Sequence, residues 1–101
     1  MARLSVDKKQ LVRWQSLKAA EVLPLVGEHV KVDATFKALT HPSTQRFHVT
    51  ACGHDFELVC TGEKWWDTRA KRGGGGAVDL VMHLRLCDFK NAVAFLKSVG
   101  L

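Results

Sequence analysis

The residues with the clearest chemical potential lie in one stretch, residues 64–76, which combines two tryptophans, four basic side chains and four glycines. Arginine and lysine bind phosphate groups, indole rings stack on bases, and backbone N–H groups at the start of a helix attract anions. We therefore interpret this stretch as a receptor for an extended anionic polymer. The candidate contact residues are Lys64, Trp65, Trp66, Arg69, Lys71, Arg72, Gly74 and Gly75.

The same stretch also has a purely structural interpretation. Glycines before a helix often form a tight turn that lets the helix pack close to a strand. Two neighbouring tryptophans in a strand usually send at least one ring into the core. We expect the stretch to shape the fold whether or not it also contacts a ligand.

Other kinds of chemistry are disfavoured. No Lys-Ser or Lys-Thr follows the glycines at 73–76, which excludes a P-loop, and no crossover unit of the dinucleotide-binding type surrounds them. Asp79 and His83 are four residues apart and could form an acid–base pair, but a pair on the helix surface is the preferred interpretation. We expect no catalytic residue and therefore no enzyme.

Composition limits the class of protein. With 101 residues, 47% of them apolar, the chain is expected to form one packed domain over 1–101. The formal net charge of +5 favours a polyanionic partner. No run of 18 apolar residues and no signal-peptide core are present, so we expect a cytoplasmic protein without a membrane partner. Three irregularly spaced cysteines fit reduced thiols.

The first element that must position the stretch is a helical arm over about residues 5–26. Ser5 is a suitable cap for a helix over residues 6–21. Pro24 lacks an N–H group and disfavours helical geometry in the residue before it, so we expect it to break this helix and leave only a short turn behind it.

Alternation of apolar and polar residues predicts a sheet over about residues 30–69. Sequential short strands joined by tight turns favour an antiparallel meander, because parallel neighbours need long crossovers. The expected strands are 30–36, 47–52, 55–60 and 64–68, with a loop at 41–45 and turns at 53–54 and 61–62.

Two helices over about residues 77–99 are expected to follow a Gly-rich turn at 73–76 and to cover one face of the sheet. Asp88 can cap the second of them. The predicted fold class is therefore α+β: an N-terminal helix, a four-stranded antiparallel meander, the Gly-rich turn and two C-terminal helices. The apolar sets of the two helices are Ala77, Leu80, Val81 and Leu84, then Phe89, Ala92, Val93, Leu96 and Val99.

The order of these elements resembles the zinc-ribbon domain of bacterial replicative primases. It is still more similar to the degenerate, metal-free form found in primase-like proteins of plasmids and other mobile elements. The resemblance runs from about Leu17 to Leu101 and rests on the segments EKWWDTR, GGGGAVDLVMHL and DFKNAVAFL.

The primase ribbon carries a Cys-x-x-Cys pair just before its glycines, and this chain departs from that pattern. The matching positions are Thr68 and Lys71, and the first ligand pair has at best a relic in Cys52 and His54. A structural zinc ion needs four regularly spaced N or S ligands. We therefore expect no metal and no other cofactor, with apolar contacts holding the fold instead.

The resemblance implies a non-catalytic module that binds nucleic acid, single-stranded DNA in the first place, in a primase, replication or mobile-element system. A primase or helicase subunit is the implied protein partner. The alternative is a protein-interaction module that docks a replication or conjugation partner through the sheet face and the tryptophan pair, without touching DNA.

Overall fold

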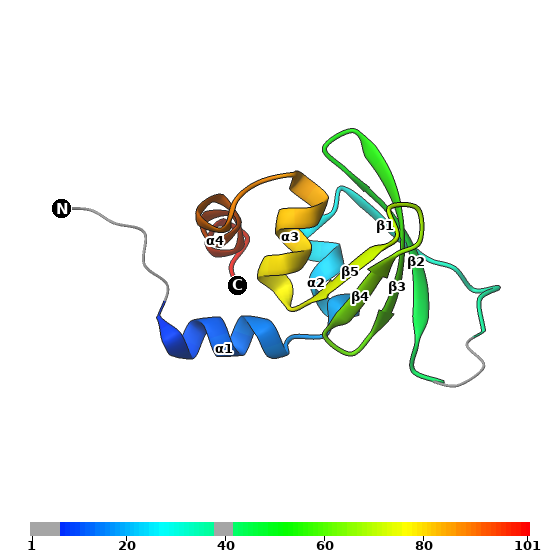
Figure 1. Ribbon diagram of the computed structural model, residues 1–101, viewed down its shortest axis with the longest axis horizontal. Helices are drawn as coiled ribbons and strands as arrows, with labels where there is room; N and C mark the ends of the chain where they lie inside the picture. Colours follow the sequence, from blue (N-terminus) through cyan, green and yellow to red (C-terminus); the bar gives the residue numbers. More distant parts are fainter. Residues whose placement is uncertain (1–6, 38–41) are drawn as a thin grey trace.

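The structure of the protein is a computed structural model that describes residues 7–37 and 42–101. Ser5, the expected helix cap, and His41, in the expected loop, lie outside these ranges. Within them the chain is α+β, as predicted, with four helices and a five-stranded sheet (Figure 1). The helices are α1 (Lys8–Ser16), α2 (Ala19–Val26), α3 (Ala77–Arg85) and α4 (Phe89–Ser98). The strands are β1 (His29–Val32), β2 (Gln45–Ala51), β3 (His54–Thr61), β4 (Lys64–Asp67) and β5 (Arg72–Gly75).

The strands lie in the order β1-β2-β3-β4-β5, and each is antiparallel to its neighbour. The turn between β2 and β3 falls one residue earlier than predicted, because Cys52 (φ 51°) and Gly53 (φ 77°) both adopt positive φ. Two such residues match the twist of a two-residue hairpin. A cysteine gives no sequence signal for this conformation.

The prediction of four strands and a Gly-rich turn is wrong, because residues 73–75 belong to the fifth strand, β5. Glycine is depleted in strands, and a run of glycines lacks the alternation of apolar and polar side chains that would predict one. The pairing nevertheless requires glycine: a Cβ atom on Gly73 would lie 2.6 Å from the carbonyl oxygen of Trp65. The turn into α3 is made by Gly76 alone, at φ 88°.

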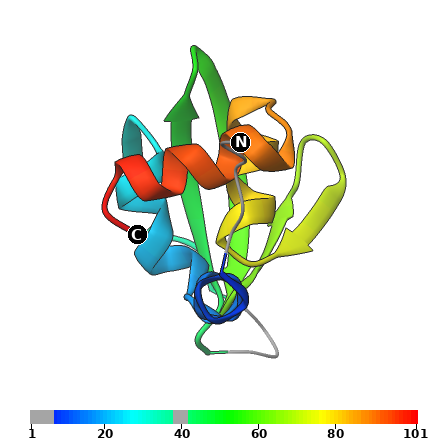
Figure 2. The same ribbon diagram turned by 90° about the vertical axis from the view of Figure 1, so that its left-hand side faces the viewer.

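The helices cover one side of the sheet in two layers (Figures 1 and 2). Helices α2 and α3 lie directly against the sheet, and α4 packs on the outer side of α3. The expectation that both C-terminal helices lie on the sheet is therefore wrong for α4, since α2 occupies part of that surface. The predicted cap of α4 is confirmed, because the Asp88 carboxylate accepts a bond from Asn91 N at 2.9 Å.

The N-terminal arm is two helices rather than the predicted single one. The break comes at Leu17 and Lys18, both extended, where Ala19 N bonds the carbonyl oxygen of Gly62 at 2.8 Å. Pro24 lies inside α2 and does not break it. Pro24 is exposed. The tertiary bond from Ala19 N to Gly62, and not the proline, sets the break. Asp7 caps α1 by accepting from Lys9 N.

One apolar core joins the sheet to the helix layers. Its largest fully buried side chains include Trp14 on α1 and leucines on α2, β3, α3 and α4. Burying a leucine contributes about 1.5–3 kcal/mol, so these contacts anchor each helix. The fully buried leucines are Leu23, Leu58, Leu80, Leu84 and Leu96. In the described part of the chain, no helix is both long and apolar enough to cross a bilayer.

Candidate nucleic-acid interface

Strand β4 sends its two tryptophans to opposite sides of the sheet, as successive strand residues must. Trp65 is 4% exposed, and its ring lies 4.6 Å from the imidazole of His83 on α3, centroid to centroid. Trp66 is 47% exposed on the side that the helices leave uncovered. Of the two tryptophans on β4, Trp66 is therefore the one that is available to a partner.

We call the uncovered side of the sheet the open face. Cross-strand partners share a face, so the register and the burial of alternate residues identify its members. They are His29 and Lys31 on β1, Arg46, His48 and Thr50 on β2, Asp55, Glu57, Val59 and Thr61 on β3, and Lys64 and Trp66 on β4.

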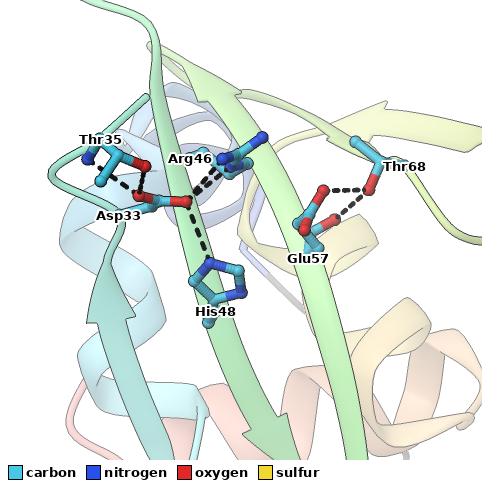
Figure 3. Close-up of polar contacts among 6 residues, drawn as sticks. All are labelled: Asp33, Thr35, Arg46, His48, Glu57 and Thr68. Carbon is cyan, nitrogen blue, oxygen red and sulfur yellow. Dashed lines mark hydrogen bonds and ion pairs between the residues drawn. The ribbon is translucent and has the colours of Figure 1, made fainter. Parts of the chain in front are cut away.

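A carboxylate neutralises one cation of the open face. Asp33 Oδ2 accepts from Arg46 Nε at 2.9 Å and Nη2 at 2.7 Å, and from His48 Nε2 at 3.2 Å (Figure 3). The other oxygen accepts from the hydroxyl and the N–H of Thr35. The Thr35 hydroxyl and then the Arg46 guanidinium hold the pKa of Asp33 far below its usual range. Nothing in the local pattern predicted this cluster.

Two contacts fold the start of the β4–β5 loop onto β3. The hydroxyl of Thr68 donates to Glu57 Oε1 at 2.8 Å (Figure 3). Arg69 Nη1 donates to the carbonyl oxygen of Asp55 at 3.3 Å. Arg69 is thereby brought to the open face, while its charge stays unneutralised because a carbonyl is not a counter-ion.

A buried carboxylate fixes the rest of that loop. Asp67 Oδ1 accepts from the N–H groups of Arg69 and Ala70, each at 2.9 Å, and Oδ2 accepts from His83 Nε2 at 2.7 Å. Burial raises the pKa of Asp67, but the hydrogen bonds from Ala70 and His83 outweigh it, so the pKa lies below the ordinary value. The Asp67–His83 pair joins the loop to α3.

The structure separates the basic residues that adjoin each other in sequence. Arg72 is in register with Asp67, so it lies on the helix side of β5, where it lines a hollow with Asp79 and His83. Lys71 is exposed in the loop at φ 56°. Lys64 and Arg69 stay with Trp66 on the open face, whereas Arg72 and Trp65 do not.

Two of the glycine N–H groups that we expected to be free are bonded within the protein. Gly75 N donates to Asp79 Oδ2 at 3.2 Å, and Gly76 N donates to the carbonyl oxygen of Glu63 at 3.0 Å. The N–H group of Gly75, one of the candidate contacts, therefore already has an acceptor within the protein, and the prediction that it is free is wrong. Asp79 and His83 likewise bond different partners and form no acid–base pair.

The cysteines are all free thiols in three environments. Cys52 is exposed, Cys87 is half-buried, and burial raises the pKa of Cys60 to about 12. Within residues 7–37 and 42–101, no group of three or more His, Cys, Asp or Glu side chains could hold a metal ion.

No family model matches the chain, and no solved structure matches it. One similar protein is a "65 kDa protein" of Zymomonas mobilis subsp. mobilis, 28% identical over 93 residues. The match covers 92% of this chain but only 14% of that protein. The relative therefore carries a region like this one inside a much longer polypeptide.

Proposed function

We propose that the protein is a non-catalytic module that binds single-stranded DNA on the open face of its sheet. The observation that carries the proposal is the exposed ring of Trp66, which lies on an uncovered antiparallel face with Lys64 two residues before it. An indole on such a face can stack on a base of any identity, which contributes about 1–3 kcal/mol per base.

The Trp66 ring is held in place before any ligand arrives. A Cβ atom on Gly73 would lie 2.8 Å from Trp66 Cε3, so the ring packs against the bare backbone of β5. Covering a glycine in this way is a structural role in its own right. The contact also restricts the Trp66 side chain before a ligand binds. Less conformational entropy is then lost on binding, which favours affinity.

The cations around the Trp66 ring would supply the electrostatic part of the binding free energy. Lys31, Lys64 and Lys71 form no ion pair with any described residue, and Arg69 bonds only a carbonyl. Each phosphate that such a group neutralises releases counterions, which makes binding salt-dependent and insensitive to base sequence. Arg72 is left out of the proposed contacts because it lies on the helix side.

The cellular role follows from the resemblance to metal-free primase ribbons. We propose that the module serves a primase, replication or mobile-element system, with a primase or helicase subunit as partner. The region of the 65 kDa relative supports a modular use, since a similar segment there is one part of a longer chain.

A second candidate is a protein-docking module that does not contact DNA. It is favoured by Leu86 and Phe89, which are 78% and 46% exposed on either side of the turn between α3 and α4. Large contiguous apolar patches mark protein-interaction surfaces, and these two side chains would supply part of such a patch. This pair lies in the helix layers, away from the open face.

The two candidates are separated by titrating a labelled oligothymidylate of about ten nucleotides into the protein and following fluorescence anisotropy. Trp66→Ala should weaken binding about 5- to 150-fold, the equivalent of about 1–3 kcal/mol of stacking. Phe89→Ala is the matched control, because it removes an aromatic ring of similar exposure from α4 and should leave binding unchanged. Equal affinities of the two variants, or no binding by the wild type, would contradict the proposal.

A further inference from the structure

A hollow of about 440 Å³ lies on the open face over β1, β2 and β3. None of the motifs in the sequence pointed to it. The polar residues of its lining are His29, Lys31, His48, Thr50, Asp55 and Arg69. They come from three strands and the β4–β5 loop, so only the folded sheet brings them together.

The charge of this hollow is predominantly positive. Lys31 is exposed and has no ion-pair partner in the described part of the chain, and Arg69 bonds the carbonyl oxygen of Asp55 rather than a carboxylate. The one carboxylate, Asp55, already accepts from the hydroxyl of Thr50 at 2.8 Å. Two cations therefore face one hydrogen-bonded acid, and a concave surface concentrates their field.

The neighbouring acids Asp33 and Glu57 do not line the hollow, and both are bonded to other side chains. Asp33 is occupied by Arg46 and His48, and this contact fixes the imidazole at the hollow's wall. Glu57 bonds Thr68 on the side of β4. The hollow is thus lined by donors that a single anionic group could use.

We propose that this hollow is a phosphate-binding subsite for the backbone of a nucleic-acid strand whose base stacks on Trp66. The inference rests on the proposed function and extends it by naming a second contact point and the path of the strand. A phosphate in the hollow would contact Lys31 and Arg69.

The register sets the length of strand that reaches both points. Lys31 is opposite His48, and Trp66 is opposite Val59, which is opposite Arg46. Lys31 and Trp66 are therefore three strands apart across the sheet and two residues apart along it. With strands about 4.8 Å apart and about 3.3 Å per residue, their backbones lie about 16 Å apart. At about 3.4 Å per stacked nucleotide, a strand of about five stacked nucleotides spans this distance.

The test compares Lys31→Gln with the wild type on oligothymidylates of about two and about eight nucleotides, at about 50 and 200 mM salt. For the longer strand, the variant should bind more weakly at low salt, and its salt slope should fall by about 0.7, the value for one lost single-strand phosphate contact. The wild type's fold-loss of affinity between the two salts should then be about 2.6-fold larger than the variant's. The short strand cannot reach the hollow while its base stacks on Trp66, so it should bind both proteins equally.

Two control variants keep the result interpretable. Lys90→Gln removes the same charge from α4 in the outer helix layer and should leave both strands unaffected. Lys31→Arg restores the cation and should restore the longer strand's salt slope. If the wild type binds and Trp66→Ala weakens it, but Lys31→Gln keeps the wild-type slope, the subsite is overturned while the proposed function stands. If the wild type binds neither strand, both proposals are overturned.

Discussion

The two faces of the sheet contain the same pair of motifs, a tryptophan and an aspartate–histidine contact, in opposite environments. On the helix side, Trp65 and the Asp67–His83 pair are buried, with a 2.7 Å contact between side chains 3% and 8% exposed. On the open face, Trp66 and the Asp33–His48 pair meet solvent, and the contact is 3.2 Å between side chains 13% and 45% exposed.

Burial, not residue type, therefore decides what each motif does. A buried pair left without one partner is strongly destabilising, because the remaining polar group has no water to replace it. An exposed pair exchanges its partner for water at little cost. We therefore assign the helix side to stability and the open face to binding.

The largest expected effect breaks the buried pair. Asp67→Ala leaves His83 and the N–H groups of Arg69 and Ala70 without their acceptor. We expect the free energy of unfolding to fall by about 3–5 kcal/mol, measured by urea denaturation. The matched variant Asp33→Ala should lose less stability, because Arg46 and His48, with side chains 30% and 45% exposed, can bond water instead. Similar losses from the two variants would remove the distinction between the faces.

Acid titration of the wild type extends this test. The pKa of Asp67 is lowered by folding, so its contribution to stability is present above the unfolded value of about 3.9 and disappears as the pH falls through the lower folded pKa. Asp67→Ala should therefore have a flatter stability profile than the wild type below about pH 4.

An intermediate effect is expected from the glycine strand. A Cβ atom on Gly74 would collide with the Asp79 carboxylate and lie 2.8 Å from Trp65 Cζ2 on the helix side. Gly74→Ala should destabilise the fold by about 1–3 kcal/mol, the cost of overpacking. Gly75→Ala is the control, because its Cβ atom would meet nothing within 4 Å. Thermal unfolding of both variants measures the difference, and equal midpoints would contradict the described packing of β5.

The smallest expected effect concerns two arginines that are close in sequence but lie on different faces. Arg69→Gln should lower the salt slope of single-strand binding by about 0.7, because one phosphate contact is lost. Arg72→Gln should leave that slope unchanged, since Arg72 lies beside Asp79 and His83. The readout is the same titration at several salt concentrations. If Arg72→Gln lowered the salt slope as much as Arg69→Gln does, the binding site would have to include the whole stretch of residues 64–76.

Part of the candidate site could be predicted from the sequence. The pattern identified β4 as a strand, Trp66 and Lys64 as contact candidates, and Asp88 as a helix cap. It could not identify Asp33 and Arg46 as partners, because they are thirteen residues apart and meet through the β1–β2 pairing. It also could not assign residues 73–75 to a strand, since glycine carries no side-chain alternation.

The α+β class, the alternation within each strand and the excess of positive charge follow from the sequence alone, because local periodicity and composition are properties of the chain. The side of the sheet that the helices cover depends instead on contacts between segments that are distant in the sequence. That choice buried Trp65, exposed Trp66, drew Arg69 and Arg72 apart and assembled the hollow around Lys31. The alternation along a strand shows that neighbouring side chains point to opposite faces of the sheet. Packing between distant segments then decides which of the two side chains stays exposed to water.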